Sequence, residues 1–136
     1  MTITVPGLTN ARSWTAVCSY QALVANRGVC ARVGADHVAI FRVVFGDAEK
    51  TERLFALSNV DPFCSASVLS RGLIGSTRIG ERGESSESIE QRVYVASPMR
   101  KHRFDLASGV CLDDASVILT TYPVRVVHDV VEVGSS

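Results

Sequence analysis

Several features that define common classes of protein are missing from this sequence. No apolar run approaches the roughly 20 residues of a membrane-spanning helix, because even the longest runs, such as Val38–Phe41 before Arg42, are only four residues long. The segment Met1–Trp14 has no basic start followed by an apolar block, so no secretory signal is predicted. Neither sign of charge is in excess, since 14 Lys and Arg residues balance 14 Asp and Glu residues, which argues against nucleic acid or an acidic membrane as the main partner. We therefore expect a cytoplasmic protein.

Motifs of several enzyme and metal-binding classes are also missing. The cysteines are Cys18, Cys30, Cys64 and Cys111. No two of them have zinc-site or CxxC spacing, and cytosolic thiols stay reduced, so we expect four free and mostly buried thiols. Ser97 is not part of a GxSxG elbow, which leaves a hydrolase unsupported. The run Gly72–Thr77 lacks the lysine of a phosphate-binding loop.

Alternating apolar residues dominate what is present. Apolar residues make up 46% of the 136 residues, which suits one packed domain. Period-two patterns occur in Val38–Val43, Leu54–Ser58, Val93–Val95 and Val124–Val133. Many short strands separated by turn residues predict an antiparallel β-sandwich or barrel, with a tight turn at His128–Asp129. We expect an all-β fold in a single domain, residues 1–136, with its core at about 13–133.

Two segments depart from the strand pattern. Ser19–Ala25 and Ala66–Arg71 are long enough for short helical turns only, and in the first we expect Tyr20, Leu23 and Val24 to point inward. The segment Gly75–Gln91 is polar, charged and rich in Gly and Ser. Burial of so few apolar side chains cannot offset the entropy of ordering it, so we predict a long mobile insertion over 75–91.

Two further segments carry the functional information. The first, Asn59–Ala66, reads NVDPFCSA, and the second, Ser97–Leu106, reads SPMRKHRFDL and is followed by the turn Ser108–Asp114. They resemble the two cluster-binding loops of Rieske proteins, which carry Cys-Pro-His in the first loop and Cys-Pro-x-His in the second. The resemblance implies a Rieske-like fold.

The four positions that would ligate iron in a Rieske protein hold other residues. Asp61 and Ser97 stand where that family has cysteine, and Phe63 and Arg100 stand where it has histidine. One iron of such a cluster needs two thiolates and the other needs two imidazoles. A phenyl ring offers no lone pair, and a guanidinium stays protonated. We therefore expect no cofactor and no metal in this chain.

A Rieske-like scaffold without its ligands resembles the small subunits of assimilatory NAD(P)H-dependent nitrite reductases. The other segments that match the pattern of that family are Gly28–Cys30, Ala39–Arg42, Val68–Gly75 and Tyr122–Val126. The resemblance implies a non-catalytic, cofactor-free subunit of an enzyme that reduces nitrite to ammonium in nitrate assimilation. Its partner would be a large subunit that carries FAD, sirohaem and an iron–sulfur cluster.

The same resemblance makes the two loops a candidate contact surface, because in Rieske proteins this end meets the redox partner. The candidate partner-binding residues are Phe63, Arg71, Met99, Arg100 and Lys101. The three cations are equally consistent with a solvated face, and Asp61 before a proline is more typical of a turn than of acid–base chemistry. We interpret His37, His102 and His128 as turn or strand residues and not as ligands.

Two other functions stay open from the sequence. A true Rieske-type [2Fe–2S] electron carrier would need ligands that this chain lacks, and a cofactor-free binding module of unrelated function would not need a nitrite-reducing partner. The sequence does not determine the stoichiometry, the docking surface, or the choice between NADH and NADPH.

Overall fold

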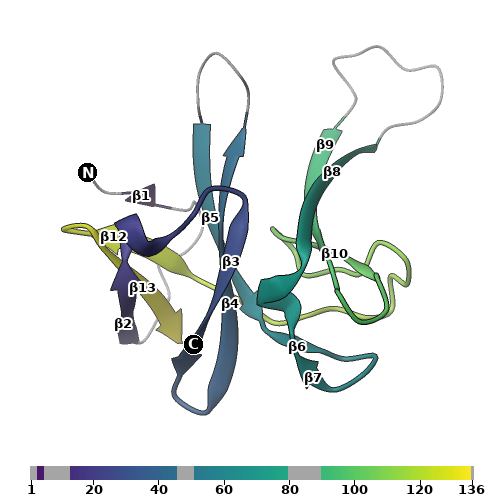
Figure 1. The fold of residues 1–136 in the computed structure, drawn as a ribbon, viewed down its shortest axis with the longest axis horizontal. Coiled ribbons are helices and arrows are strands. Elements are labelled where there is room, and N and C mark those ends of the chain that lie inside the picture. Colours follow the sequence, from purple (N-terminus) through teal and green to yellow (C-terminus); the bar gives the residue numbers. More distant parts are fainter. Residues whose placement is uncertain (1–2, 5–12, 46–50, 80–89, 136) are drawn as a thin grey trace.

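The computed structural model describes residues 3–4, 13–45, 51–79 and 90–135 (Figure 1). The strands are β1 (Ile3–Thr4), β2 (Ser13–Ser19), β3 (Arg27–Val33), β4 (Asp36–Phe45), β5 (Thr51–Ser58), β6 (Val60–Asp61), β7 (Ala66–Ser67), β8 (Leu73–Ile79), β9 (Glu90–Ala96), β10 (Arg103–Asp105), β11 (Thr121–Tyr122), β12 (Val124–Val127) and β13 (Val130–Ser135). Two single-turn 3-10 helices, η1 (Tyr20–Ala22) and η2 (Leu69–Arg71), complete the description. None of the described helices is long and apolar enough to cross a membrane.

The strands form three antiparallel layers, which lie from left to right in Figure 1. The central sheet has the order β11-β5-β4-β3. On one side lies the sheet β1-β12-β13-β2, and on the other lies β10-β9-β8, with the small ribbon β6-β7 beside it. The predicted all-β sandwich is thus confirmed, and the described sheets do not close into a barrel.

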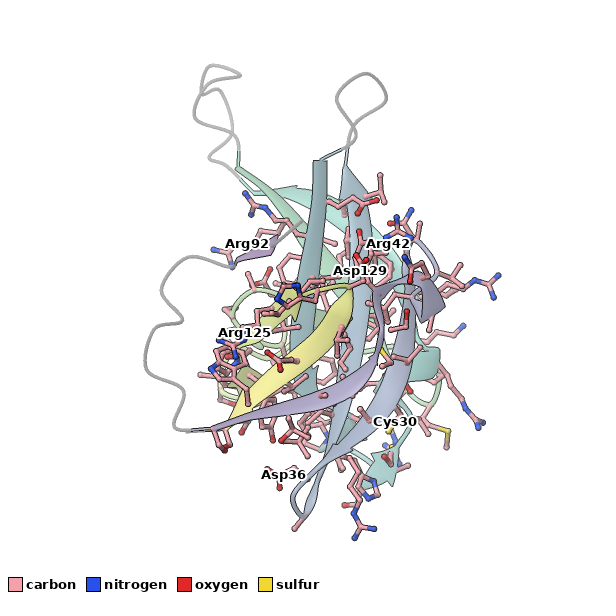
Figure 2. All side chains as sticks on the ribbon, turned by 90° about the vertical axis from the view of Figure 1, so that its left-hand side faces the viewer. Cys30, Asp36, Arg42, Arg92, Arg125 and Asp129 are labelled. Atoms are coloured by element: carbon pink, nitrogen blue, oxygen red, sulfur yellow. The ribbon has the colours of Figure 1, made fainter. Side chains whose placement is uncertain are left out.

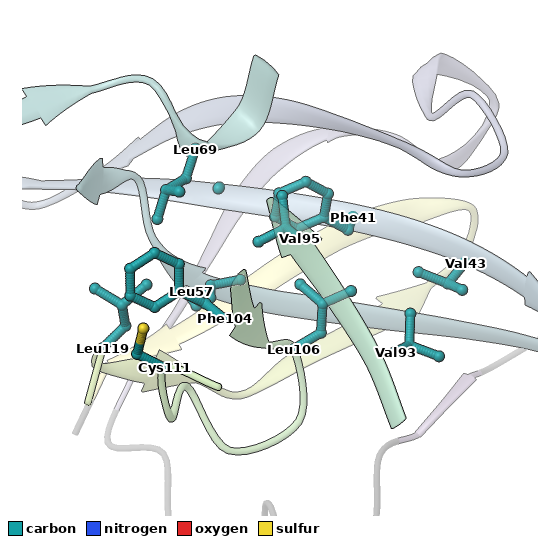
Figure 3. Packing of buried hydrophobic residues seen from close by; sticks show 11 residues of the cluster. Phe41, Val43, Leu57, Leu69, Val93, Val95, Phe104, Leu106, Cys111 and Leu119 are labelled. Atoms are coloured by element: carbon teal, nitrogen blue, oxygen red, sulfur yellow. The ribbon is translucent and has the colours of Figure 1, made fainter. Parts of the chain in front are cut away.

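The central strand β4 is buried on both faces, which explains its nearly continuous run of apolar residues. Val38 and Ile40 pack in a cluster with the valines of β12 and β13. The alternate residues of β4, such as Phe41, belong to a second cluster formed with β9 and β10. Figure 3 shows this second cluster, in which Val43 and Val93 lie at one end and Phe104 at the other. That second end supports the loops described below.

The turn predicted at His128–Asp129 is confirmed. Both residues have positive φ, 51° and 63°, as the two central residues of a tight hairpin turn require. The hairpin joins β12 to β13, where Arg125 forms an ion pair with Glu132 at 2.7 Å. The Arg125 guanidinium also lies 4.0 Å from the centre of the Trp14 ring of β2, which ties the edge strand to the hairpin.

Two sequence-based expectations need correction. The expected insertion over 75–91 is shorter, because β8 continues to Ile79 and β9 begins at Glu90. Backbone pairing across this hairpin does not depend on apolar side chains, so a polar sequence can still form strands. The remaining expected loop, 80–89, lies outside the described residues. In η1 and its flank, Leu23 is buried as expected, but Val24 is 58% exposed and not inward.

The cysteines are free, as expected, but not mostly buried. Cys111 is buried in the core, Cys18 and Cys64 are half-buried, and Cys30 is exposed. Cys30 lies on β3, which is an edge strand of the central sheet over the part of the chain that the structure describes (Figure 2). Burial raises the pKa of the Cys18 thiol.

Candidate functional site

The first loop turns between β6 and β7 around a buried aspartate. Asp61 has no solvent exposure, and its Oδ1 accepts a hydrogen bond from the backbone N–H of Phe63 at 2.9 Å. Its backbone carbonyl also accepts hydrogen bonds from the N–H groups of Cys64 and Ser65, at 3.3 and 2.7 Å. These contacts make Asp61 the organising residue of an Asx turn, which agrees with the turn interpretation of its sequence context.

A buried asparagine anchors the base of this loop. Asn59 is 1% exposed, and its Oδ1 accepts a hydrogen bond from the backbone N–H of Ser70 at 2.6 Å. Its Nδ2 donates to Ser67 Oγ at 2.7 Å, and its backbone carbonyl accepts from Val68 and Leu69. Asn59 therefore joins the loop to η2. The sequence placed Asn59 in the motif but predicted no role for it.

The second loop, Ser97–His102, is closed at its base by two backbone hydrogen bonds. The N–H of Ser97 donates to the carbonyl of His102, and the N–H of Lys101 donates to the carbonyl of Ser97, each at 2.9 Å. Lys101 takes a positive φ of 62° to complete the turn. The residues between them, Pro98–Arg100, are all exposed. We call this loop and the first loop, residues 61–66, together the tip.

The two loops of the tip are joined by a direct side-chain hydrogen bond. Ser97 Oγ donates to Asp61 Oδ2, and both residues are buried. Ser97 Oγ also accepts a long hydrogen bond, 3.4 Å, from the backbone N–H of Met99. By their resemblance to the loops of Rieske proteins, Asp61 and Ser97 occupy the positions of the two cysteine ligands. A hydrogen bond between them holds together two loops that a metal cluster holds together in Rieske proteins.

At the position of the first missing histidine ligand, the Phe63 side chain packs against neighbouring rings. The Phe63 ring stacks on the His102 ring, with centroids 3.8 Å apart and planes 8° apart. Phe63 also lies 6.2 Å from Phe104, which belongs to the core cluster seen in Figure 3. His102 is thus a half-buried residue that stacks on Phe63. Its role in packing Phe63 had no signal in the sequence.

The remaining candidate residues are exposed. Arg100, the position of the second lost histidine, is at the outer end of the second loop beside Lys101, and Met99 is 59% exposed. Arg71 lies at the end of η2. Phe63 differs from these four, because it is only partly exposed and its ring packs against His102 and the core.

One exposed residue near the tip was not predicted. Leu73, the first residue of β8, is 78% exposed. It pairs with Ala96, which directly precedes Ser97, while its neighbour Ile74 packs on the core beside Val95. The alternation of a strand therefore places Leu73 on the outer face. The sequence shows the alternation but not which of the two faces is covered.

The side chains of the tip do not fit a [2Fe–2S] cluster. Asp61 and Ser97 hydrogen-bond each other, Phe63 is stacked, and Arg100 offers no electron pair. Over the described residues, no three His, Cys, Asp or Glu side chains come close enough to hold a metal ion. The tip is instead a pair of loops that a side-chain hydrogen bond joins at one end of a β-sandwich.

These observations define the class of protein: a Rieske-like domain whose ligand positions hold other residues. Residues 13–134 match the model of the family described as Rieske-like [2Fe-2S] domain, and the chain belongs to that family. The ferredoxin of carbazole 1,9a-dioxygenase from Nocardioides aromaticivorans shares the fold, with a TM-score of 0.62, 18% identity and coverage of 91% of this chain and 99% of the ferredoxin. At that identity the likeness concerns the fold alone.

Relatives with similar sequences assign the chain to a particular group within the Rieske-like family. The NADH nitrite reductase small subunit of Salmonella typhimurium is 40% identical over 119 residues, which cover 88% of this chain and 94% of that protein. The small subunit from Escherichia coli is 39% identical over the same length and with the same coverage. The solution structure of the E. coli protein NirD superposes with a TM-score of 0.70 and 36% identity, covering 91% of this chain and 97% of NirD. The chain therefore belongs to the nitrite reductase small subunits.

A further relative is a larger protein. The NAD(P)H nitrite reductase large subunit of Klebsiella oxytoca contains a segment that is 35% identical over 124 residues. The match covers 91% of this chain and only 11% of that large subunit. Nearly the whole of the present domain thus has a counterpart inside a single large-subunit chain.

Proposed function

We propose that this chain is a cofactor-free accessory subunit of an NAD(P)H-dependent nitrite reductase that reduces nitrite to ammonium. The observation that carries the proposal is the Klebsiella large subunit, which contains a counterpart of this domain in its own chain. Covalent linkage keeps two modules at high effective concentration. The same domain occurs fused to a large subunit in Klebsiella and as a separate chain here. We therefore take the complex with a large subunit to be the functional state of this chain.

The proposed role of this chain is binding and not redox chemistry. The large subunit would carry FAD, sirohaem and an iron–sulfur cluster, as the family resemblance implies, and would perform the electron transfer. The present chain would contribute a folded surface at the tip. The candidate contact residues are Phe63, Arg71, Met99, Arg100 and Lys101. A cytoplasmic location is part of this proposal.

The proposal predicts a complex with one copy of this chain per large subunit, because the Klebsiella chain matches the domain over one 124-residue segment. A tagged form of this chain, expressed with its cognate large subunit, is expected to co-purify with it. The mass of the purified complex, measured under native conditions, gives the ratio. Failure of the two full-length chains to associate would contradict the proposal.

The main alternative, a Rieske-type electron carrier, makes the opposite prediction about iron. With Asp61, Phe63, Ser97 and Arg100 at the ligand positions, we expect the purified chain to be colourless and to contain no stoichiometric iron or sulfide. Metal analysis and a visible absorption spectrum test this expectation. Stoichiometric iron together with sulfide would support the electron carrier and overturn the cofactor-free assignment.

A further inference from the structure

Three cations at and beside the tip have no hydrogen-bond or ion-pair partner among the residues that the structure describes. Arg71, Arg100 and Lys101 are exposed, and the structure gives none of their side chains a hydrogen bond or ion pair with any described residue. Arg103, by contrast, is paired with Asp113 at 2.9 Å. The three cations thus lie exposed on the outer side of the loops, free to contact another molecule.

The acidic residues nearest in the chain to these cations are already engaged. Asp61 is buried and accepts hydrogen bonds from Ser97 and from the backbone of Phe63. Asp105 is 5% exposed and accepts two hydrogen bonds from Ser108, at 2.9 and 2.6 Å. The whole chain is neutral, with 14 residues of each sign. The three exposed cations are thus not the result of an excess of basic residues in the chain as a whole.

Two exposed apolar side chains accompany the cations. Leu73 and Met99 are 78% and 59% exposed. The segments that carry them are in contact, because Leu73 pairs with Ala96 and a side chain at Gly72 would collide with the Ala96 carbonyl oxygen. Arg71 and Leu73 therefore lie beside the second loop. We call Arg71, Leu73, Met99, Arg100 and Lys101 the tip patch.

The loop that presents most of this patch is already ordered. Two backbone hydrogen bonds close Ser97–His102, and Ser97 is tied to Asp61. A partner that binds this loop does not have to order it first, which lowers the entropic cost of association. An apolar centre with arginine around it is typical of the energetic core of an interface.

We infer that the tip patch binds an acidic segment of the large subunit that carries at least one apolar side chain. Carboxylates of the partner would pair with Arg71, Arg100 and Lys101, and its apolar side chain would cover Leu73 and Met99. This inference rests on the proposed function, since it names the chemistry of the partner surface. It replaces Phe63 by Leu73 as the apolar contact, because Phe63 is committed to the stack on His102.

The test compares two charge-reversal variants that change the net charge equally. Arg71→Glu/Arg100→Glu acts on the tip patch. The matched control is Arg53→Glu/Arg92→Glu, which acts near the starts of β5 and β9, at the opposite ends of these strands from the tip. Figure 2 shows Arg92 far from Asp36 and Cys30, at the other end of the molecule. Thermal unfolding of each variant verifies that the fold is retained.

Binding of each variant to the cognate large subunit is measured by titration at several salt concentrations. We expect the tip variant to raise Kd roughly thirtyfold or more and to flatten the dependence of Kd on salt, since like charges then face each other. The control is expected to stay within about threefold of the wild type, because both arginines lie at the ends of β5 and β9 that are remote from the tip. A second variant, Leu73→Ser/Met99→Ser, is expected to weaken binding while keeping the salt dependence.

The outcomes separate the inference from the proposed function. If the wild-type chain does not bind the large subunit, the proposed function fails. If the wild type binds and both tip variants bind as tightly as the control, the proposed function stands and the inference is overturned. Sedimentation of the chain alone tests whether the patch binds a second copy of this chain instead. If the wild type forms a dimer that the tip variants dissociate, and the variants still bind the large subunit normally, the patch serves self-association and the inference is overturned.

Discussion

Replacing Phe63 with alanine is expected to lower the free energy of unfolding by about 2–4 kcal/mol, somewhat less than the loss for a fully buried phenylalanine. The variant loses the stack on His102 and the contact with Phe104, and it leaves the His102 ring uncovered. Urea denaturation followed by tryptophan fluorescence measures the change, because Trp14 is the single tryptophan of the chain. Phe63 is therefore a poor probe of docking, since its loss disturbs the tip itself.

A double-mutant cycle isolates the ring contact. Phe63→Ala, His102→Ala and the double variant are compared with the wild type, and the stacked pair is expected to show a coupling of about 0.5–1.5 kcal/mol. Phe63→Leu serves as the conservative control and should cost less than the alanine change. A Phe63→Ala variant as stable as the wild type would show that the ring is not part of the packing.

Replacing Ser97 with alanine is the second large effect. Ser97 Oγ donates to the Asp61 carboxylate, and both groups are buried. Removing the hydroxyl leaves a buried carboxylate oxygen without its donor, and such a loss costs about 2–3 kcal/mol when the acceptor is charged. The expected result is a stability lower by that amount, measured by urea denaturation, with the secondary structure unchanged in the folded state.

The chain provides a matched control for Ser97. Ser116 Oγ also donates to an aspartate, Asp114, at 2.6 Å, but both residues are exposed. Water can replace the lost hydroxyl there, so Ser116→Ala is expected to cost less than about 0.5 kcal/mol. Equal effects of the two substitutions would mean that the hydrogen bond between the loops does not hold the tip together.

Much of the fold was predictable because its signals are local. The alternation in Val38–Val43 and Leu54–Ser58 identifies β4 and β5, and His128–Asp129 identifies the last hairpin. The extent of the β8–β9 hairpin was not predictable from composition. A polar strand is stabilised by backbone pairing with its neighbour, and a composition argument counts only side chains.

The site was predictable in its residues and not in its contacts. The motifs identify Asp61, Phe63, Ser97 and Arg100 as the substituted positions. They do not show that Ser97 and Asp61 bond to each other or that Phe63 stacks on His102, because these pairs are distant in the sequence. Leu73 was missed for a related reason. Which face of β8 is covered depends on the central sheet that packs against it and not on the alternation of the strand itself.

Losing the ligands changes what the tip is able to do. A Rieske tip brings a metal centre near the surface, whereas this tip has a buried hydrogen bond, a stacked ring pair and an exposed patch of positive and apolar side chains. The first two stabilise the loops, and the third is free to contact another protein. The residues that stabilise the tip are therefore different from the residues available to bind a partner.

The most direct test of the account is the rate of NAD(P)H-dependent nitrite reduction by the cognate large subunit as this chain is titrated in. The added chain is first verified by metal analysis to be free of iron. We expect a rate that rises saturably and levels off at one chain per large subunit. A rate that does not change at any ratio, or one that rises only with an iron-loaded chain, would contradict it.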